Sequence, residues 1–173
     1  GQCRRDDTFG PHSPTVNPPA DLLASLELVT RGKPFPWVWL ATSDQDLGAR
    51  VRTVRILNYN LRQVCFTFAS HADHAKHQQI AHDPRGQLCL LLEAPLIQIR
   101  LDVLLTTTPA PQHPLGERMW QKVMGNDRQA LYNVHPQSPK PPQSFVIVEA
   151  RSEAADVLCL GPDQRELAGV HDL

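Results

Sequence analysis

The stretch from Phe68 to Gln98, FASHADHAKHQQIAHDPRGQLCLLLEAPLIQ, decides the fold of this chain. It reads as the end of a strand, the start of a helix that carries one lysine, and a second strand that ends in a glutamine. The apolar pattern predicts a strand over residues 61–69, a helix over residues 73–81 and a strand over residues 87–93. A strand, a short helix and a strand in close succession indicate a domain that mixes strands with a few helices.

On either side of this stretch, apolar periodicity and turn residues predict the remaining elements. In chain order these are a helix opened by Asn17-Pro18-Pro19 and stopped by Gly32, strands over 34–43 and 49–57 with a turn over 44–48, a turn over 58–60, a break at Pro84 and Gly86, a strand over 97–107, a linker over 109–114, helices over 115–124 and 127–134, a loop over 136–142, and strands over 144–150 and 155–160. Six or seven strands with a few helices predict a mainly β domain, an antiparallel barrel over residues 18–173 that follows an irregular segment at 1–17.

Composition is that of one ordinary globular domain. The chain has 173 residues, 41% of them hydrophobic, and a formal net charge of −1. A charge this small gives no overall attraction for nucleic acid or for an anionic membrane, so neither is an expected partner. No run approaches the roughly 18 to 20 apolar residues that span a bilayer, and the chain, which begins with glycine, has no signal-peptide pattern. The expected location is the cytoplasm.

Four scattered cysteines, Cys3, Cys65, Cys89 and Cys159, form no C-x-x-C pair. Such spacing in a chain of this length does not indicate a disulfide framework. Cys65 and Cys89 lie in apolar runs, where a thiol packs as a small hydrophobic group.

Basic and hydroxyl side chains gather around the central stretch. The run VRTVRIL places Arg52, Thr53 and Arg55 on one predicted strand, and Ser70 and Lys76 flank the start of the predicted helix. Together with the free amides of a helix start, these groups resemble a cradle for an anion, because each donates a hydrogen bond or a positive charge. Alternation along a strand puts Arg52 and Arg55 on opposite faces, so joint contact with one phosphate requires strong twist. The residues predict a phosphorylated ligand.

Taken in order, these pieces resemble a known family. Its pattern is a strand ending L-A-T, a glycine turn, R-T-V on a strand, a serine and lysine around a helix start, N-P-R, and a strand with Q-x-R. The matching residues here are Leu40-Ala41-Thr42, Gly48, Arg52-Thr53-Val54, Ser70 with Lys76, Asp83-Pro84-Arg85, and Gln98 with Arg100. The order and spacing resemble the flavin-binding split-barrel family of pyridoxamine 5'-phosphate oxidase and its shorter relatives, over about a third of the chain.

The resemblance implies a six- or seven-stranded antiparallel split β-barrel with flanking helices. It also implies FMN as cofactor, a homodimer with the cofactor at the subunit interface, and a flavin-dependent oxidoreductase acting on a small molecule. In this reading the FMN-binding positions are Arg52, Thr53, Val54, Arg55, Ala69, Ser70, His74, Ala75, Lys76, Gln98 and Arg100, with Gln98 bonded to the flavin ring. The sequence identifies no general acid or base. The alternatives are a heme-binding or non-enzymatic split barrel that has lost flavin binding, and an FMN carrier or sensor without turnover.

The chain also departs from the family pattern. Asp73, His74 and Ala75 stand where relatives have a serine or an arginine beside the lysine, and Asn58 stands where a second basic residue is common. Asp102-Val103 replaces a small residue after the Q-x-R strand. Asp73 is therefore expected to oppose anion binding, and a side chain at 102–103 is expected to crowd the flavin ring. We do not expect a genuine pyridoxamine phosphate oxidase.

Histidine and tryptophan clusters have simpler explanations. His71, His74, His77 and His82 lie close together with Asp73, and His74 and His77 could share a helical face, which would suit a metal. The cluster has no repeated ligand signature, so a solvated helix surface is expected. Trp37, Trp39 and Trp120 are expected as core or interface anchors, with Trp120 and Tyr132 near the cofactor or substrate by the resemblance. No serine or cysteine nucleophile with supporting context is present, so hydrolase chemistry has little support.

Overall fold

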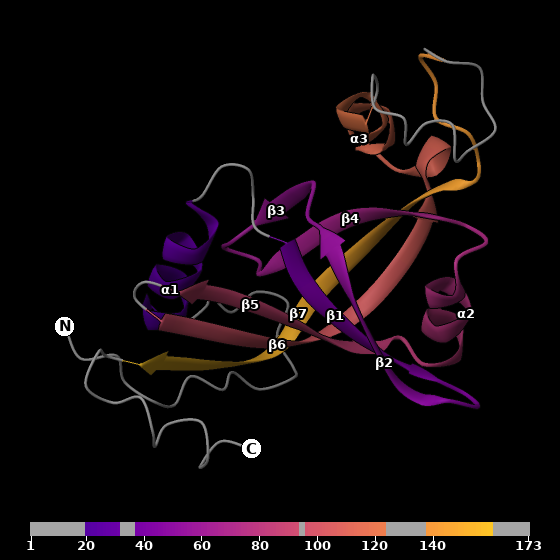
Figure 1. Cartoon of the computed structure of the whole chain (residues 1–173). Helices are drawn as coiled ribbons and strands as arrows, with labels where there is room; N and C mark the ends of the chain where they lie inside the picture. The colour runs from indigo at the N-terminus through magenta and orange to yellow at the C-terminus, as the bar shows by residue number, and fades with distance from the viewer. Residues whose placement is uncertain (1–19, 32–36, 94–95, 124–137, 161–173) are drawn as a thin grey trace.

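The computed structural model describes residues 20–31, 37–93, 96–123 and 138–160, and within them the chain is mainly β (Figure 1). In chain order the elements are α1 (Ala20–Thr30), β1 (Trp37–Asp44), β2 (Gly48–Arg55), β3 (Asn58–Asn60), β4 (Cys65–His71), α2 (Ala75–His82), β5 (Arg85–Glu93), β6 (Leu96–Pro109), the 3₁₀ turn η1 (Ala110–Gln112), α3 (Gly116–Val123) and β7 (Phe145–Leu160). The strands form one antiparallel sheet in the order β2-β1-β5-β6-β7-β4-β3. This is the mainly β, split-barrel-like architecture that the sequence predicts.

The core lies on one face of this curved sheet. On β6 the residues Ile97, Ile99, Leu101, Val103 and Leu105 are all buried, while the positions between them are partly or fully exposed. Apolar side chains from the other long strands pack on the same face, and Leu22, Leu26 and Val29 of α1 close one end of the core. In Figure 1, α1 and α2 lie at different ends of the sheet.

A second cluster stands where β6 ends and β7 begins. Trp120 of α3 is fully buried, its ring meets Phe145 edge to face at 5.0 Å, and its indole N–H donates to the carbonyl of Ser138 at 2.7 Å. The first residue of α3, Gly116, has to be a glycine, because a Cβ there would lie 1.8 Å from the carbonyl oxygen of Ala110. Trp120 is therefore a core residue of this cluster, as the sequence predicts.

Two predicted boundaries before α2 are wrong. Residues 58–60 are the short strand β3 and not a turn, and residues 61–64 form the turn instead of starting a strand. Asn60 causes this shift, because its side-chain oxygen accepts the backbone N–H of Gln63 at 3.2 Å and closes the turn. Val64 ends the turn with φ of 47°, a conformation that a β-branched residue rarely adopts and that its buried position holds in place.

Two further predictions are wrong in β5 and β7. Gly86 lies inside β5 and does not break it; a Cβ there would lie 2.8 Å from the carbonyl oxygen of Ala41, so the glycine allows the neighbouring strand to approach. Residues 145–160 form one strand, because a bulge lets Glu153 stand between the paired residues Ser152 and Ala154 without a partner of its own on β6. The interval that the sequence predicts between two strands, at residues 151–154, contains this bulge.

Several expectations concern absences or residues outside the described ranges. No helix among the described residues is long and apolar enough to cross a membrane, and the cytoplasmic location stays a prediction. The same residues contain no group of histidine, cysteine or acidic side chains that could hold a metal ion. Cys65 and Cys89 are free thiols. The predicted segment at 1–17, the ends of the first helix at Asn17 and Gly32, the helix over 127–134, Tyr132 and Cys3 lie outside the described residues.

Candidate functional site

The start of α2 is the centre of the candidate site. His74 precedes the helix with extended backbone angles, and its side chain makes no capping hydrogen bond to the first turn. The first turn also contains no acidic residue, and its second residue is Lys76. An uncapped helix start carries a partial positive charge, and a lysine there adds to it. This local arrangement favours an anionic ligand.

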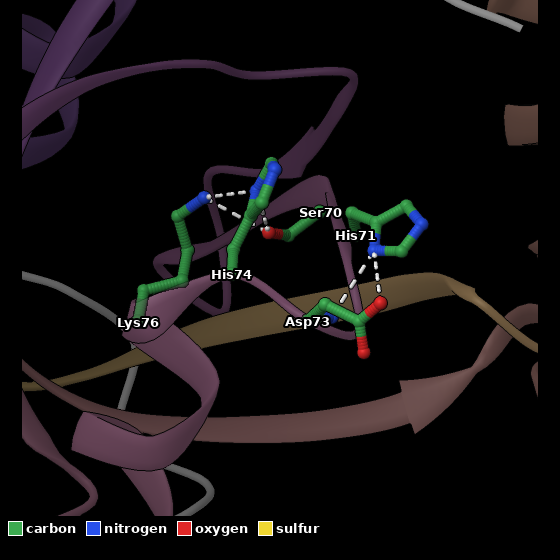
Figure 2. A network of polar contacts seen from close by, with 5 residues as sticks. All are labelled: Ser70, His71, Asp73, His74 and Lys76. Carbon is green, nitrogen blue, oxygen red and sulfur yellow. Dashed lines mark hydrogen bonds and ion pairs between the residues drawn. The ribbon is translucent and has the colours of Figure 1, made fainter. Parts of the chain in front are cut away.

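Three side chains meet beside this helix start (Figure 2). The ammonium group of Lys76 donates to Ser70 Oγ at 2.9 Å and faces His74 Nδ1 at 3.3 Å, and Ser70 Oγ lies 3.2 Å from the same nitrogen. An ammonium group can only donate, so His74 Nδ1 is an acceptor here and the ring proton sits on Nε2. Ser70 comes from the end of β4 and is buried, so it fixes the position of the lysine. Lys76 and Ser70 are brought together as the sequence predicts.

Asp73 does not enter this group. Figure 2 shows its carboxylate on the side of His71, whose Nδ1 lies 3.7 Å from Asp73 Oδ2 and accepts the Asp73 backbone N–H at 3.1 Å. The Asp73 side chain is 90% exposed, so solvent screens its charge. The expected opposition to anion binding is therefore weak in this geometry.

Arg52 reaches the same end of the sheet from β2. Its guanidinium donates through Nη1 to Thr42 Oγ1 at 2.7 Å and to the carbonyl of Leu40 at 3.3 Å, and through Nη2 to Gln79 Oε1 at 2.6 Å. Thr42 is on β1, and Gln79 is on α2, one helical turn after Lys76. The hydrogen bonds of Arg52 thus join the β1–β2 hairpin to the helix that carries Lys76.

The electrostatics of the group are those of a site that lacks negative charge. Burial, and then the charge of Arg52, lower the pKa of Lys76. Burial, and then Lys76 and His71, lower the pKa of His74, and burial followed by Arg50 lowers the pKa of Arg52. A bound anion would act in the opposite direction on all three, because it stabilises their protonated forms.

The other predicted residues of this region lie on β2, β4 and α2. Val54 is buried in the core, and Thr53 and Arg55 are exposed on the other face of β2, so Arg55 does not join Arg52. Ala69 is half-buried near the end of β4, and Ala75 is exposed as the first residue of α2. Ala75 offers only its backbone N–H, which points out of the first turn of a helix.

Gln98 and Arg100 lie on the face of β6 that points away from the core. Gln98 is half-buried, and the register places Leu91 and Leu158 beside it on the neighbouring strands. Arg100 forms an ion pair with Asp156 of β7, its register partner. Arg52, in contrast, is the register partner of the buried Leu40 on the core side of the β1–β2 hairpin and reaches α2, so one copy of the chain presents the predicted site in two parts.

Asp102 and Val103, which were expected to crowd the flavin ring, point to opposite faces of β6. Val103 is 2% exposed and packs in the core, so it does not point toward a ligand on the outer face. Asp102 is exposed and accepts the side-chain amide of Gln87 at 3.0 Å. Both residues contribute to the lining of an open groove of 540 Å³ beside Thr42 and Gly86. Of the two, Asp102 is the exposed one and offers its carboxylate to the groove.

Sequence reasoning missed the residues that hold the site together. Gln79, Thr42 and Asp44 form hydrogen bonds between α2 and the β1–β2 hairpin, and none of them was predicted to have a role in the site. One signal was present, because Gln79 follows Lys76 by three residues and so shares its side of a helix. That spacing does not identify its partners.

His77 gives this region an expected dependence on pH. Its Nε2 is buried without a hydrogen-bond partner in the part of the chain that the structure describes, and burial, followed by the charge of Lys76, lowers its pKa to about 4. The unfolded chain therefore binds this proton more readily than the folded one, and stability is lost as the pH falls from about 6.5 toward 4. We expect a loss of about 1 to 2 kcal/mol by pH 4.5, after allowing for solvent screening.

Urea unfolding of the wild type and of His77→Gln at pH 7.5 and pH 4.5 measures this loss. The variant should lose less stability than the wild type between the two pH values. His82→Gln is the control, because His82 is exposed on the same helix. An equal pH dependence in all three proteins would exclude His77 as the cause.

Comparison with known proteins supports the fold. No protein-family model matches the sequence, and no curated protein is significantly similar to it. Among solved structures, a pyridoxamine 5'-phosphate oxidase-related, FMN-binding protein from Nostoc punctiforme matches with a TM-score of 0.69 and 19% identity, over 88% of this chain and 89% of that one. General stress protein 26 from Bacillus anthracis matches with 0.56 and 14%, over 80% and 98%.

An F420 reductase has a TM-score of 0.53 and 18% identity, over 75% of this chain and 94% of its own. At these identities the likeness concerns the fold. The structural neighbours of this chain are pyridoxamine 5'-phosphate oxidase-related FMN-binding proteins and general stress protein 26 relatives, and the chain has their split-barrel-like fold.

Proposed function

We propose that this protein binds FMN, with the phosphate at the start of α2, and acts as a flavin-dependent oxidoreductase on a small molecule. The observation that carries the proposal is the position of Lys76, which lies in an uncapped first helical turn beside the buried Ser70. The fold is one that FMN-binding proteins also have. Charge-assisted hydrogen bonds of this kind suit a phosphate group, which accepts several donors at once.

Each residue has a distinct part in this proposal. Lys76 and the first backbone N–H groups of α2 hold the phosphate, and Arg52 supplies the second positive charge. His74 donates to the phosphate through Nε2–H, and a bound dianion raises its pKa. Ser70 keeps the lysine in place. The Asp73 carboxylate does not compete for this position, because it faces His71.

FMN, when bound, supplies the redox chemistry. The chain supplies phosphate binding, a hydrogen bond to the ring from Gln98, and a surface for the substrate. Because Gln98 and Lys76 lie in separate parts of one chain, we propose that the ring is held between two copies, with Gln98 of one copy facing the phosphate-binding group of the other. The protein is then a homodimer with two equivalent sites.

The outer face of β1 and β2 suits the proposed homodimer. Trp37 and Trp39 are 52% and 40% exposed on β1, and Val51 is 68% exposed on β2, with Ala41 as its register partner. Exposed tryptophans are frequent anchors of protein interfaces, because they bury much apolar area. This face also continues across β5 to the side of β6 that carries Gln98 and Arg100.

Replacing Trp39 with alanine is expected to weaken the dimer about 10- to 100-fold, since an interface tryptophan commonly contributes about 2 kcal/mol or more. Sedimentation equilibrium of the wild type and the variant measures the dissociation constant. Leu47→Ala is the control, because Leu47 is a 66% exposed apolar residue in the turn between β1 and β2 and not on the strand face that carries Trp39. A monomeric wild type, or equal association of wild type and Trp39→Ala, would contradict the proposed interface.

The first test of the proposed function is the visible absorption spectrum of the purified protein, followed by release and identification of any chromophore. If the protein is colourless, fluorescence titration with FMN, riboflavin and coenzyme F420 identifies which ligand binds. We expect FMN to bind and riboflavin to bind more weakly. A Soret band, or no binding of any of the three, would contradict the FMN assignment. Bleaching of bound flavin by NADH or NADPH supports an oxidoreductase, and an unreduced flavin favours a carrier.

A further inference from the structure

Gln79 is a buried polar residue on the inner side of α2, with 5% of its surface exposed. Its side chain makes all of its hydrogen bonds to the β1–β2 hairpin and none to its own helix among the described residues. We infer that Gln79 is a positioning residue that fixes the guanidinium of Arg52 so that one face of it remains available for a phosphate. The inference rests on the proposed function, and it adds a source of selectivity for the phosphorylated form of the ligand.

The orientation of the Gln79 amide follows from the chemistry of its partners. Asp44 Oδ2 lies 3.1 Å from Gln79 Nε2, and an ionised carboxylate can only accept. Backbone hydrogen bonds from Asp46 and Leu47, and then the Gln79 amide, lower the pKa of Asp44 and so keep it ionised. The nitrogen of the amide must therefore face Asp44. Its oxygen must face Arg52.

A closed set of hydrogen bonds results on the Arg52 side. Gln79 Oε1 accepts from Arg52 Nη2 at 2.6 Å and from Thr42 Oγ1 at 2.7 Å, and Thr42 Oγ1 in turn accepts from Arg52 Nη1 at 2.7 Å. These three hydrogen bonds hold the guanidinium at two of its nitrogens. Held in this way, Arg52 has few alternative rotamers, so less entropy is lost when it binds an anion.

The donors that remain on Arg52 suit a phosphate. A guanidinium has five N–H groups, and the carbonyl of Leu40, Thr42 and Gln79 take three of them. The remaining two are Nε–H and the second Nη2–H, which together form a bidentate face for a phosphate or carboxylate. Because a neutral amide holds the other side, the positive charge of Arg52 is not cancelled by its support. A glutamate in place of Gln79 would cancel it.

Helix α2 then performs two functions through residues three positions apart. Lys76 contacts the proposed phosphate, and Gln79 sets the second cation opposite it from the next turn. Arg52 is bonded to Gln79 one turn after Lys76 on the same helix, and its charge lowers the pKa of Lys76 after burial has done so. Since repulsion would drive two mobile cations apart, a fixed partner for Arg52 is needed to keep both facing one ligand.

The test compares Gln79→Met and Gln79→Glu with the wild type, and uses Gln78→Met as the matched control because Gln78 is exposed one position earlier on the same helix. Fluorescence titrations give dissociation constants for FMN and for riboflavin, which lacks the phosphate. We expect FMN affinity to fall about 10-fold in both Gln79 variants while riboflavin affinity stays unchanged, since one charged contact contributes about 1.5 kcal/mol. Equal losses for both ligands, or unchanged FMN affinity, would overturn the inference.

A second measurement needs no flavin. Guanidinium ¹H–¹⁵N resonances of Arg52, assigned with Arg52→Lys, should be resolved and slow to exchange in the wild type and broadened in Gln79→Met. Resolved signals that do not change in the variant would overturn the positioning role. If the wild type binds no flavin but the Arg52 signals broaden as expected, the proposed function fails and the positioning role of Gln79 is retained.

Discussion

Replacing Lys76 with alanine is expected to weaken FMN binding by about 1.5 to 3 kcal/mol, a factor of about 10 to 150 in the dissociation constant. The lysine is the most direct cationic contact that we propose for the phosphate, and it lies in a helix start with no cap and no acidic residue. Riboflavin affinity should stay the same, because the ring does not need this charge. Parallel fluorescence titrations with FMN and riboflavin measure both quantities.

Lys140→Ala is the control for this prediction, since Lys140 is an exposed lysine far along the chain from α2. Raising the salt concentration should weaken FMN binding in the wild type more than in Lys76→Ala, because one charge pair has been removed from the variant. Unchanged FMN affinity in Lys76→Ala would remove Lys76 from the site. A parallel loss for riboflavin would instead indicate that the substitution disturbs the helix as a whole.

The mainly β architecture could be predicted from the sequence because its strongest local signals are periodic. Alternation over residues 97–107 predicts which side of β6 is buried, and the structure confirms it residue by residue. The sequence also predicts the turn between β1 and β2 from its glycine. The structure agrees, because Gly48 adopts a φ of 76° that other residues avoid. Such features depend on residues that are close together in the chain, so they are visible in the sequence itself.

The missed features depend on contacts between distant segments. The bulge at Glu153 is set by the register of β7 against β6, and the need for Gly86 is set by the carbonyl of Ala41 on another strand. In the same way Asp73 is adjacent to the proposed site in sequence, yet its carboxylate faces His71. Val103 follows Asp102, but the pleat turns it into the core.

The candidate site shows the same division. Lys76, Ser70 and Arg52 were predicted from their chemistry, and the structure places them at one end of the sheet. The link between them was not predictable, because Gln79 and Thr42 are ordinary polar residues until a helix packs on a hairpin. Arg100 illustrates the opposite case. Its predicted role competes with an ion pair to Asp156 that the sequence could not indicate.

Truncating Trp120 to alanine is expected to cost about 3 to 5 kcal/mol of unfolding free energy, the largest effect on stability that we predict. The indole is fully buried, packs edge to face on Phe145 and donates a hydrogen bond to the carbonyl of Ser138. The substitution removes all of these contacts. Phe145 and Ile147 belong both to this cluster and to β7, which runs on into the main core, so the loss should reach the whole domain. Urea unfolding followed by circular dichroism measures it.

Two companion variants separate the causes of that loss. Trp120→Phe keeps most of the buried ring and should lose about 1 to 2 kcal/mol, chiefly through the unpaired carbonyl of Ser138. Gln121→Ala changes the adjacent exposed position of α3 and should have little effect. If Trp120→Ala costs less than about 1 kcal/mol, the cluster around α3 unfolds on its own and leaves the barrel intact. Because no hydrogen bond or ion pair joins α3 to Lys76 or Arg52 within the described ranges, a stable Trp120→Ala variant should still bind FMN.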